Sequence, residues 1–236
     1  MAVTPELLSR FPLLKPLPTD LLNQLAQQSI MRKFARRAIV LNAGVAEDSV
    51  CFLFEGRLQG VDFTIDGREV GLYFVEPGDF CGELGLFDEG KQAEYIMALT
   101  PVVVVNIPIE SLREVMLRHA GVVNQLGRKL AARVRQMTEQ RTLLGLPNVS
   151  QRVCCQLWSL VNSGAASSEM PMSLAAISNP PTHQEIAIML NVSRETVTRV
   201  FQKLQNQKIV QRAGPGSLLI NDLSALQQLA EGSREL

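Results

Sequence analysis

The feature that most constrains the fold is the segment 182–212, which has the pattern of two short helices joined by a tight turn. Thr182 can cap the first helix, and Glu185 three residues later completes a capping box. Asn191 stands where the chain must turn, and after glycine it is the residue that best tolerates a left-handed backbone. Ser193 can cap the second helix. Apolar residues recur at helical spacing and are predicted to form the buried face of this second helix: Val197, Val200, Phe201 and Leu204.

The polar face of the second predicted helix carries side chains suited to reading DNA bases. A helix-turn-helix places the first residues of its second helix in the major groove. Arginine can bond guanine through two hydrogen bonds, and glutamate accepts one from the cytosine amino group. An ordinary helical hairpin with a solvated charged face is the alternative interpretation. We predict the following DNA contacts: Thr182, His183, Gln184, Ser193, Arg194, Glu195, Thr198, Arg199 and Lys203.

Composition indicates a globular chain without a strong electrostatic bias. The 236 residues are 46% hydrophobic and 19% charged, which favours one large or two modest globular domains. The formal net charge is zero, so a DNA-binding chain of this balance must concentrate its positive charge locally. The second helix and the residues after it do so, with Arg194, Arg199, Lys203, Lys208 and Arg212.

Targeting and metal-binding patterns are not evident in the sequence. No apolar run approaches the length of a membrane span, and residues 1–6 lack a secretory pattern, so a cytoplasmic location is expected. The spacing of Cys51, Cys81, Cys154 and Cys155 fits neither zinc nor iron–sulfur sites. We therefore expect no bound metal, and we interpret these cysteines as small buried residues in a reducing compartment.

The segment 31–108 consists of short apolar or alternating stretches separated by glycine-containing turns. Such spacing predicts an antiparallel barrel or roll. Asp66-Gly67 is the strongest hairpin pattern in it. The predicted strands are 38–41, 50–54, 58–65, 69–75, 95–98 and 102–107.

A long helical pattern follows the predicted strands. Residues 111–118 are predicted to form a first helix, with a break at 119–121. From Val122 onward, apolar residues keep the spacing of a two-stranded coiled coil. This stripe could equally pack on its own domain, but a helix of this length needs a partner, and self-pairing gives a twofold dimer. The predicted interface is Val123, Leu126, Leu130, Val134, Met137 and Leu144.

Five further segments complete the organisation of the chain. Pro147-Asn148 is a predicted hinge, and a helix is predicted over 151–161. The stretch 162–181 is expected to be a loop with a weak hairpin. After the second helix of the pair, a small wing strand is predicted over 217–220 and a terminal helix over 223–230.

The run from Ser193 to Arg199 closely resembles the recognition helix of the Crp/Fnr family of transcription regulators. In the cyclic-AMP-responsive branch of that family, this helix reads a TGTGA-type half-site, and the resemblance gives this role to Arg194, Glu195 and Arg199. Asn191 departs from the glycine that many members carry, which is a conservative change for the backbone.

The resemblance covers nearly the whole chain and implies an α+β fold. The implied parts are a cyclic-nucleotide-binding-like sensor domain built as a β-roll (1–121), a dimerisation helix with a hinge (122–146) and a winged helix-turn-helix (147–236). It further implies a homodimer that binds double-stranded DNA and works with RNA polymerase. An enzyme is not expected, because no nucleophile–base pair stands out and the chain has only two histidines. A cyclic-nucleotide-regulated subunit of another effector is disfavoured by the Arg/Glu/Arg helix.

The segment 78–87 resembles the phosphate-binding cassette of cyclic-nucleotide domains. Gly82 and the residues after it can turn backbone amides toward a phosphate, and Glu83 is placed to accept a hydrogen bond from a ribose hydroxyl. A simple turn between two strands is the alternative. The candidate ligand-binding residues are Gly82, Glu83, Leu84, Gly85, Lys91, Gln92, Ala93, Met137 and Thr138.

The sequence departs from members that bind cyclic AMP at two places. They carry Arg-Ser or Arg-Thr after the cassette, whereas this chain has no arginine in 91–95 and places Glu94 there. A buried phosphate without a cationic partner is costly, and Lys91 lacks the fork of an arginine. The Thr-Ser pair that touches adenine appears here as Met137-Thr138. We therefore expect ordinary cyclic-AMP binding to be lost; another cyclic nucleotide, cyclic di-GMP or no effector all stay open.

Overall fold

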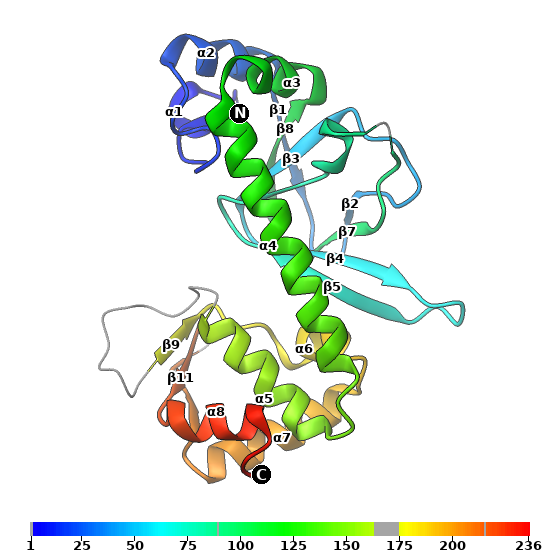
Figure 1. Ribbon diagram of the computed structural model, residues 1–236, viewed down its shortest axis with the longest axis vertical. Coiled ribbons are helices and arrows are strands. Elements are labelled where there is room, and N and C mark those ends of the chain that lie inside the picture. Colours follow the sequence, from blue (N-terminus) through cyan, green and yellow to red (C-terminus); the bar gives the residue numbers. More distant parts are fainter. Residues whose placement is uncertain (1, 89, 163–174, 215) are drawn as a thin grey trace. The chain divides into compact units, whose positions relative to one another are not determined.

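The computed structural model describes residues 2–88, 90–162, 175–214 and 216–236. Within these residues the chain forms two compact units, Met1–Met137 and Thr138–Leu236. Each unit has its own hydrophobic core. The boundary falls inside one long helix, α4 (Ala120–Leu144), which is drawn in green in Figure 1.

Unit 1 is built around an antiparallel β-roll. Its described residues form two four-stranded sheets, in the orders β1-β8-β3-β6 and β2-β7-β4-β5. The first sheet contains β1 (Ile30–Phe34), β8 (Val102–Pro108), β3 (Ser49–Glu55) and β6 (Phe80–Cys81). The second contains β2 (Ile39–Leu41), β7 (Tyr95–Ala98), β4 (Leu58–Phe63) and β5 (Glu69–Val75). Buried side chains of both sheets share one core, as expected for a roll.

Two strands of the roll escaped prediction from the sequence, for different reasons. β1 lies at the edge of its sheet and carries Arg32 and Lys33, which are exposed, so it lacks an apolar run. β6 is only two residues long. The predicted hairpin is present, but its connection is longer than two residues: Phe63 pairs with Glu69, and Gly67 turns with a φ of 79°.

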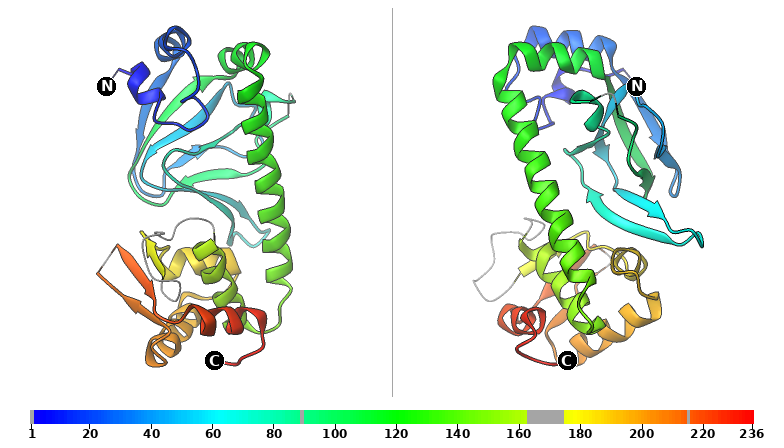
Figure 2. Two further views of the ribbon diagram at one scale, coloured as in Figure 1. Left: turned by 60° about the vertical axis from the view of Figure 1, so that its left-hand side comes forward. Right: turned by 45° about the vertical axis from the view of Figure 1, so that its right-hand side comes forward.

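Helices cover one face of the first sheet and form a second core in unit 1. These are α1 (Pro5–Leu8), α2 (Thr19–Gln28), α3 (Ile109–Arg118) and the first turns of α4 (Figure 2). Val122 and Leu126 of α4 are 2% and 1% exposed in this core. The compact unit therefore extends to residue 137, beyond the boundary at 121 expected from the sequence, because the start of α4 packs on its own roll.

Unit 2 contains the predicted helix pair and a small sheet. Its described elements are α5 (Val149–Leu160), β9 (Ala175–Ser178), α6 (His183–Leu190), α7 (Arg194–Asn206), β10 (Val210–Arg212), β11 (Ser217–Ile220) and α8 (Leu223–Glu231). Its described strands pair in the order β10-β11-β9, so β9 and β10 enlarge the wing, for which only β11 was expected. Most of the predicted loop 162–181 lies outside the described residues.

The four cysteines all fall within the described ranges and are free thiols. Three are buried, and Cys155 is half-buried, which agrees with their interpretation as small core residues. Among the helices that the structure describes, none combines the length and the apolar character required to cross a membrane.

Candidate functional site

The helix pair of unit 2 is held by helix caps that were predicted from the sequence. The Thr182 hydroxyl accepts a hydrogen bond from the Glu185 amide at 3.3 Å, and the Glu185 carboxylate accepts one from the Thr182 amide at 2.9 Å. Asn191 adopts the left-handed conformation, with φ and ψ both at 50°. The Ser193 hydroxyl caps α7 by accepting from the Thr196 amide at 3.2 Å. The predicted capping box, turn and second cap are all confirmed.

Helix α7 has one buried and one exposed face. The predicted buried set is at most 4% exposed, which fixes the rotation of the helix in unit 2: Val197, Val200, Phe201 and Leu204. Arg194, Glu195 and Arg199 are exposed. The backbone amide of Glu195 and the Ser193 hydroxyl lower the pKa of the Glu195 carboxyl, so it is an ionised acceptor at neutral pH. Two guanidinium groups and a carboxylate therefore face solvent together near the start of α7.

Thr198 and His183 have an internal role in the helix pair. The Thr198 hydroxyl donates to the Arg194 carbonyl at 2.9 Å, so its oxygen accepts from His183 Nδ1, 3.0 Å away. This assignment places the proton of the neutral imidazole on Nδ1. The ring lies against Phe201, with 4.4 Å between ring centroids. Nε2 is buried and has no hydrogen-bond partner within the described part of the chain.

The surroundings of His183 favour its neutral form. Burial, followed by the positive charges of Arg212 and Arg194, lowers the pKa of His183 from its ordinary value. A histidine whose pKa is lower in the folded state stabilises the fold above its unfolded pKa of about 6.5, and this contribution is lost as the pH falls from that value through the lower pKa of the folded state. Acidification should therefore weaken unit 2.

We expect the stability of unit 2 to fall as the pH drops below about 6.5, the ordinary histidine pKa. His183→Asn keeps an N–H donor for Thr198 but does not titrate, so it should remove most of this dependence. Trp158, the single tryptophan, lies in α5 of unit 2, and its fluorescence during urea unfolding reports on this unit. Equal pH dependence in both proteins would contradict the assignment.

The cassette of unit 1 connects β6 to a short 3-10 helix, η1 (Leu84–Leu86). Gly82 has a φ of 78°, and a Cβ on it would lie 2.9 Å from the Leu41 side chain, so glycine is required there. Arg113 of α3 holds the other end of the cassette. Its guanidinium donates to the carbonyls of Gly85 at 2.6 Å and Leu86 at 3.3 Å. No sequence pattern distinguished Arg113 from other polar residues of its helix.

Glu83 does not face an open site, because Arg133 of α4 pairs with it. The side chains of Glu83 and Arg133 are 1% and 12% exposed. The guanidinium of Arg133 also donates to the Phe80 carbonyl at 3.2 Å and lies 4.4 Å from the centre of the Tyr73 ring. Burial raises the pKa of Glu83, opposed by the Arg133 charge. Arg133 could not be identified from the sequence, because helical spacing alone does not show that its side chain points into the roll.

A second buried contact continues this network. The Tyr73 hydroxyl donates to the Glu94 carboxylate, and the same oxygen of Glu94 accepts from the Gln92 amide at 3.1 Å. Tyr73, Gln92 and Glu94 are 3%, 7% and 8% exposed. Burial raises the pKa of the Tyr73 hydroxyl, so it stays protonated and acts as a donor. Side chains thus form a chain of contacts from Gln92 to Glu83.

The other predicted pocket residues are not members of this chain of contacts. Lys91 and Ala93 are exposed. Leu84 and Met137 are 41% and 46% exposed. Thr138 belongs to unit 2. Lys129, one turn before Arg133, forms an ion pair with Asp79 and adds a second link between α4 and the cassette region.

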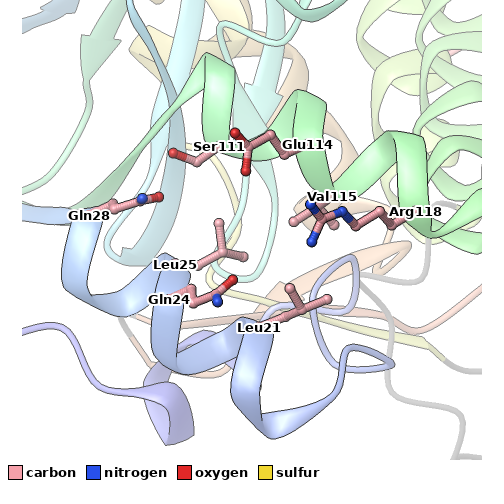
Figure 3. A pocket seen from close by; sticks show the side chains of 8 residues that line it. All are labelled: Leu21, Gln24, Leu25, Gln28, Ser111, Glu114, Val115 and Arg118. Atoms are coloured by element: carbon pink, nitrogen blue, oxygen red, sulfur yellow. The ribbon is translucent and has the colours of Figure 1, made fainter.

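A separate cavity between α2 and α3 is too small for an effector (Figure 3). Its volume is about 30 Å³, which is room for one or two water molecules. It is lined by Leu21, Gln24, Leu25, Gln28, Ser111, Glu114, Val115 and Arg118.

Each of the two units contains a segment that matches a known domain family. Residues 31–119 match the cyclic nucleotide-binding domain, and residues 151–229 match the Crp-like helix-turn-helix domain. A chain that joins these two domains is a DNA-binding transcription regulator with an effector-binding domain. This protein belongs to the Crp/Fnr family.

Relatives and solved structures support this assignment. The cAMP-activated global transcriptional regulator CRP of Pasteurella multocida is 27% identical over 185 residues, which are 78% of this chain and 87% of that protein. The structure of FixK2 from Bradyrhizobium japonicum is similar with a TM-score of 0.71, at 19% identity and over 85% of this chain and 96% of that one. The c-di-GMP responsive global regulator CLP of Xanthomonas campestris has a TM-score of 0.66 at 22% identity, over 86% and 99%. Both structural matches show the shared fold.

Proposed function

We propose that this protein is a homodimeric regulator that reads a palindromic TGTGA-like operator with helix α7. The observation that carries the proposal is the exposed face of α7, where Arg194, Glu195 and Arg199 face solvent together. Arginine pairs with guanine and glutamate with the cytosine amino group. These contacts fit the TGTGA half-site, in which G·C pairs alternate with A·T pairs. In this role the protein acts in the cytoplasm, with RNA polymerase as a further partner.

The surface of α4 supports the dimer. Val123, Val134 and Met137 are 39%, 64% and 46% exposed, and Leu130 and Leu144 are half-buried. This spacing fits the seam of a helix pair. Leu126 has to be removed from the predicted interface, because it is buried in the core of its own roll. A twofold dimer presents two recognition helices to two half-sites, which explains a palindromic operator.

Fluorescence anisotropy with a TGTGA-N6-TCACA duplex tests this function. At one fixed salt concentration, the protein should bind this duplex about a thousandfold or more tighter than one with both half-sites scrambled. The complex should contain two protein chains per duplex. Equal affinity for the two duplexes would contradict sequence-specific binding.

We further propose that this protein does not use ordinary cyclic AMP. Where cyclic-AMP-binding members of the family place an arginine, the described residues of the segment 91–95 offer the exposed Lys91 and the buried Glu94. A cyclic phosphate near Glu94 would face a carboxylate in a desolvated place, which is unfavourable. Glu83, the acceptor expected for the ribose, is already paired with Arg133. The chain of contacts from Gln92 to Glu83 supports the proposal that side chains take the place of the nucleotide.

Titration calorimetry should show no cyclic AMP binding to the wild-type protein in the micromolar range, and operator affinity should not respond to cyclic AMP. The variant Tyr73→Ser, Ala93→Arg, Glu94→Ser removes the carboxylate and the ring and supplies a guanidinium, so it should gain measurable cyclic AMP binding. Lys91→Ala, a change at an exposed residue, is the control and should behave as the wild type. Tight binding by the wild type would overturn the proposal. Titrations with cyclic GMP and cyclic di-GMP test the alternative, a regulator that responds to another nucleotide in the same pocket.

A further inference from the structure

The turn between α6 and α7 is held by side chains from outside the helix pair. The last four carbonyls of a helix have no partner within it. In α6, the Ala187 carbonyl accepts from the Val192 amide at 3.0 Å, and the Ile188 carbonyl accepts from the Asn191 amide at 3.4 Å. These two bonds are local and follow from the left-handed turn.

The remaining two carbonyls of α6 are bound by residues of α4 and α5. The side-chain amide of Gln140 in α4 donates to the Met189 carbonyl at 2.6 Å. Arg152 of α5 donates to the Leu190 carbonyl at 3.3 Å. Met189 and Leu190 are 2% and 0% exposed, so a carbonyl that lost its partner here would carry the cost of a buried unsatisfied group.

From this arrangement we infer that Gln140 is a positioning residue that sets the orientation of the recognition helix relative to helix α4. Gln140 lies in the part of α4 that belongs to unit 2, and α4 continues without interruption from the proposed dimer seam. A hydrogen bond from this helix to the turn directly before α7 lets rotation of α4 move the start of α7. The inference rests on the proposed dimer that binds a palindrome, and it names how the distance between the two reading helices is maintained.

If Gln140 has this role, changing it should alter the preference of the dimer for one spacing between half-sites. A change at a purely structural residue would not affect this preference. Adding or removing one base pair turns one half-site relative to the other by about 34°. A dimer whose recognition helices are firmly oriented rejects such duplexes. A dimer with loosened helices still reads each half-site but tolerates the wrong spacing.

The test uses the full-length protein. The operator is the duplex that the wild type selects from a randomised library, which we expect to be TGTGA-N6-TCACA. Two further duplexes have a spacer one base pair shorter or one base pair longer. Gln140→Glu has the same shape but no donor, and it should lose about fivefold or more in affinity for the natural spacing, which is the effect of one hydrogen bond. Its preference over the altered spacings should narrow. Its rejection of a single mismatched base within a half-site should equal that of the wild type.

Three further variants separate positioning from charge and folding. Gln136→Glu makes the same change one turn earlier, at an exposed residue of α4, and should behave as the wild type. Gln140→Lys restores a donor and should recover the spacing preference. If Trp158 fluorescence shows that Gln140→Glu folds poorly, the uncharged variant Gln140→Met takes its place, and it should show the same loss of affinity and of spacing preference. An unchanged spacing preference in folded Gln140→Glu and Gln140→Met would overturn the inference, whereas a wild type that prefers no palindrome would instead overturn the proposed function.

Discussion

Alanine at Arg194 and Arg199 together should abolish the preference of this protein for its operator. Each arginine paired with a guanine contributes about 1–3 kcal/mol of discrimination, so each single change should weaken cognate binding by about fivefold to 150-fold. Binding to random DNA should change much less, because base contacts contribute little there. Anisotropy titrations on cognate and random duplexes, at one salt concentration, measure both.

Two further variants sharpen the assignment of roles on α7. Glu195→Ala should relax the preference at one base pair more than it lowers affinity, because the carboxylate accepts from one cytosine. Lys203→Ala, at an exposed position farther along the helix, should reduce cognate and random binding alike, as a phosphate contact does. If the arginine variants also lose both kinds of binding equally, Arg194 and Arg199 are phosphate contacts, and unchanged binding would exclude α7 from DNA reading.

Aspartate at Leu130 should convert the protein to a monomer. The change places a charge without a partner in the apolar seam of the helix pair. Sedimentation at micromolar concentration should then give the mass of one chain. Operator affinity should drop by about a hundredfold or more, because a monomer holds one half-site at a time.

The surface position Val134 separates loss of assembly from loss of folding. Its side chain is 64% exposed in the single chain, so Val134→Asp should leave the fold intact and still weaken the dimer. Gln136→Asp, exposed on the same helix but outside the seam, should have no effect on assembly. A stable dimer with aspartate at both Leu130 and Val134 would place the interface elsewhere.

The parts of the structure that depend on neighbouring residues could be predicted from the sequence. The Thr182–Glu185 capping box, the left-handed Asn191 and the Ser193 cap are local, and each appears in the structure as predicted. The buried face of α7 follows from helical spacing in the same way. The strands with apolar runs were found for the same reason, whereas β1 and β6 depend on their partners in the sheet.

The functional sites were predictable only in part, because their contacts join distant segments. Arg133 has the spacing of a solvent-facing residue, yet its partner Glu83 lies fifty positions earlier, and only the folded roll brings the two together. His183 and Thr198 were both expected to contact DNA, but they bind one another across the helix pair. The apolar stripe of α4 did not reveal that Leu126 packs inside its own unit.

The packing of Tyr73 imposes an order on mutational change in this family member. A Cβ at position 60 would lie 2.8 Å from carbon atoms of the Tyr73 ring, and the ring is only 3% exposed, so it has little room to retreat. Tyr73 must therefore be replaced before Gly60 can gain a side chain, whereas replacing Tyr73 requires no earlier change at position 60. A lineage that reopens this part of the roll passes through a stage with glycine at 60 and a small residue at 73. The opposite intermediate, with a side chain at both positions, would be destabilised by the overlap with the ring.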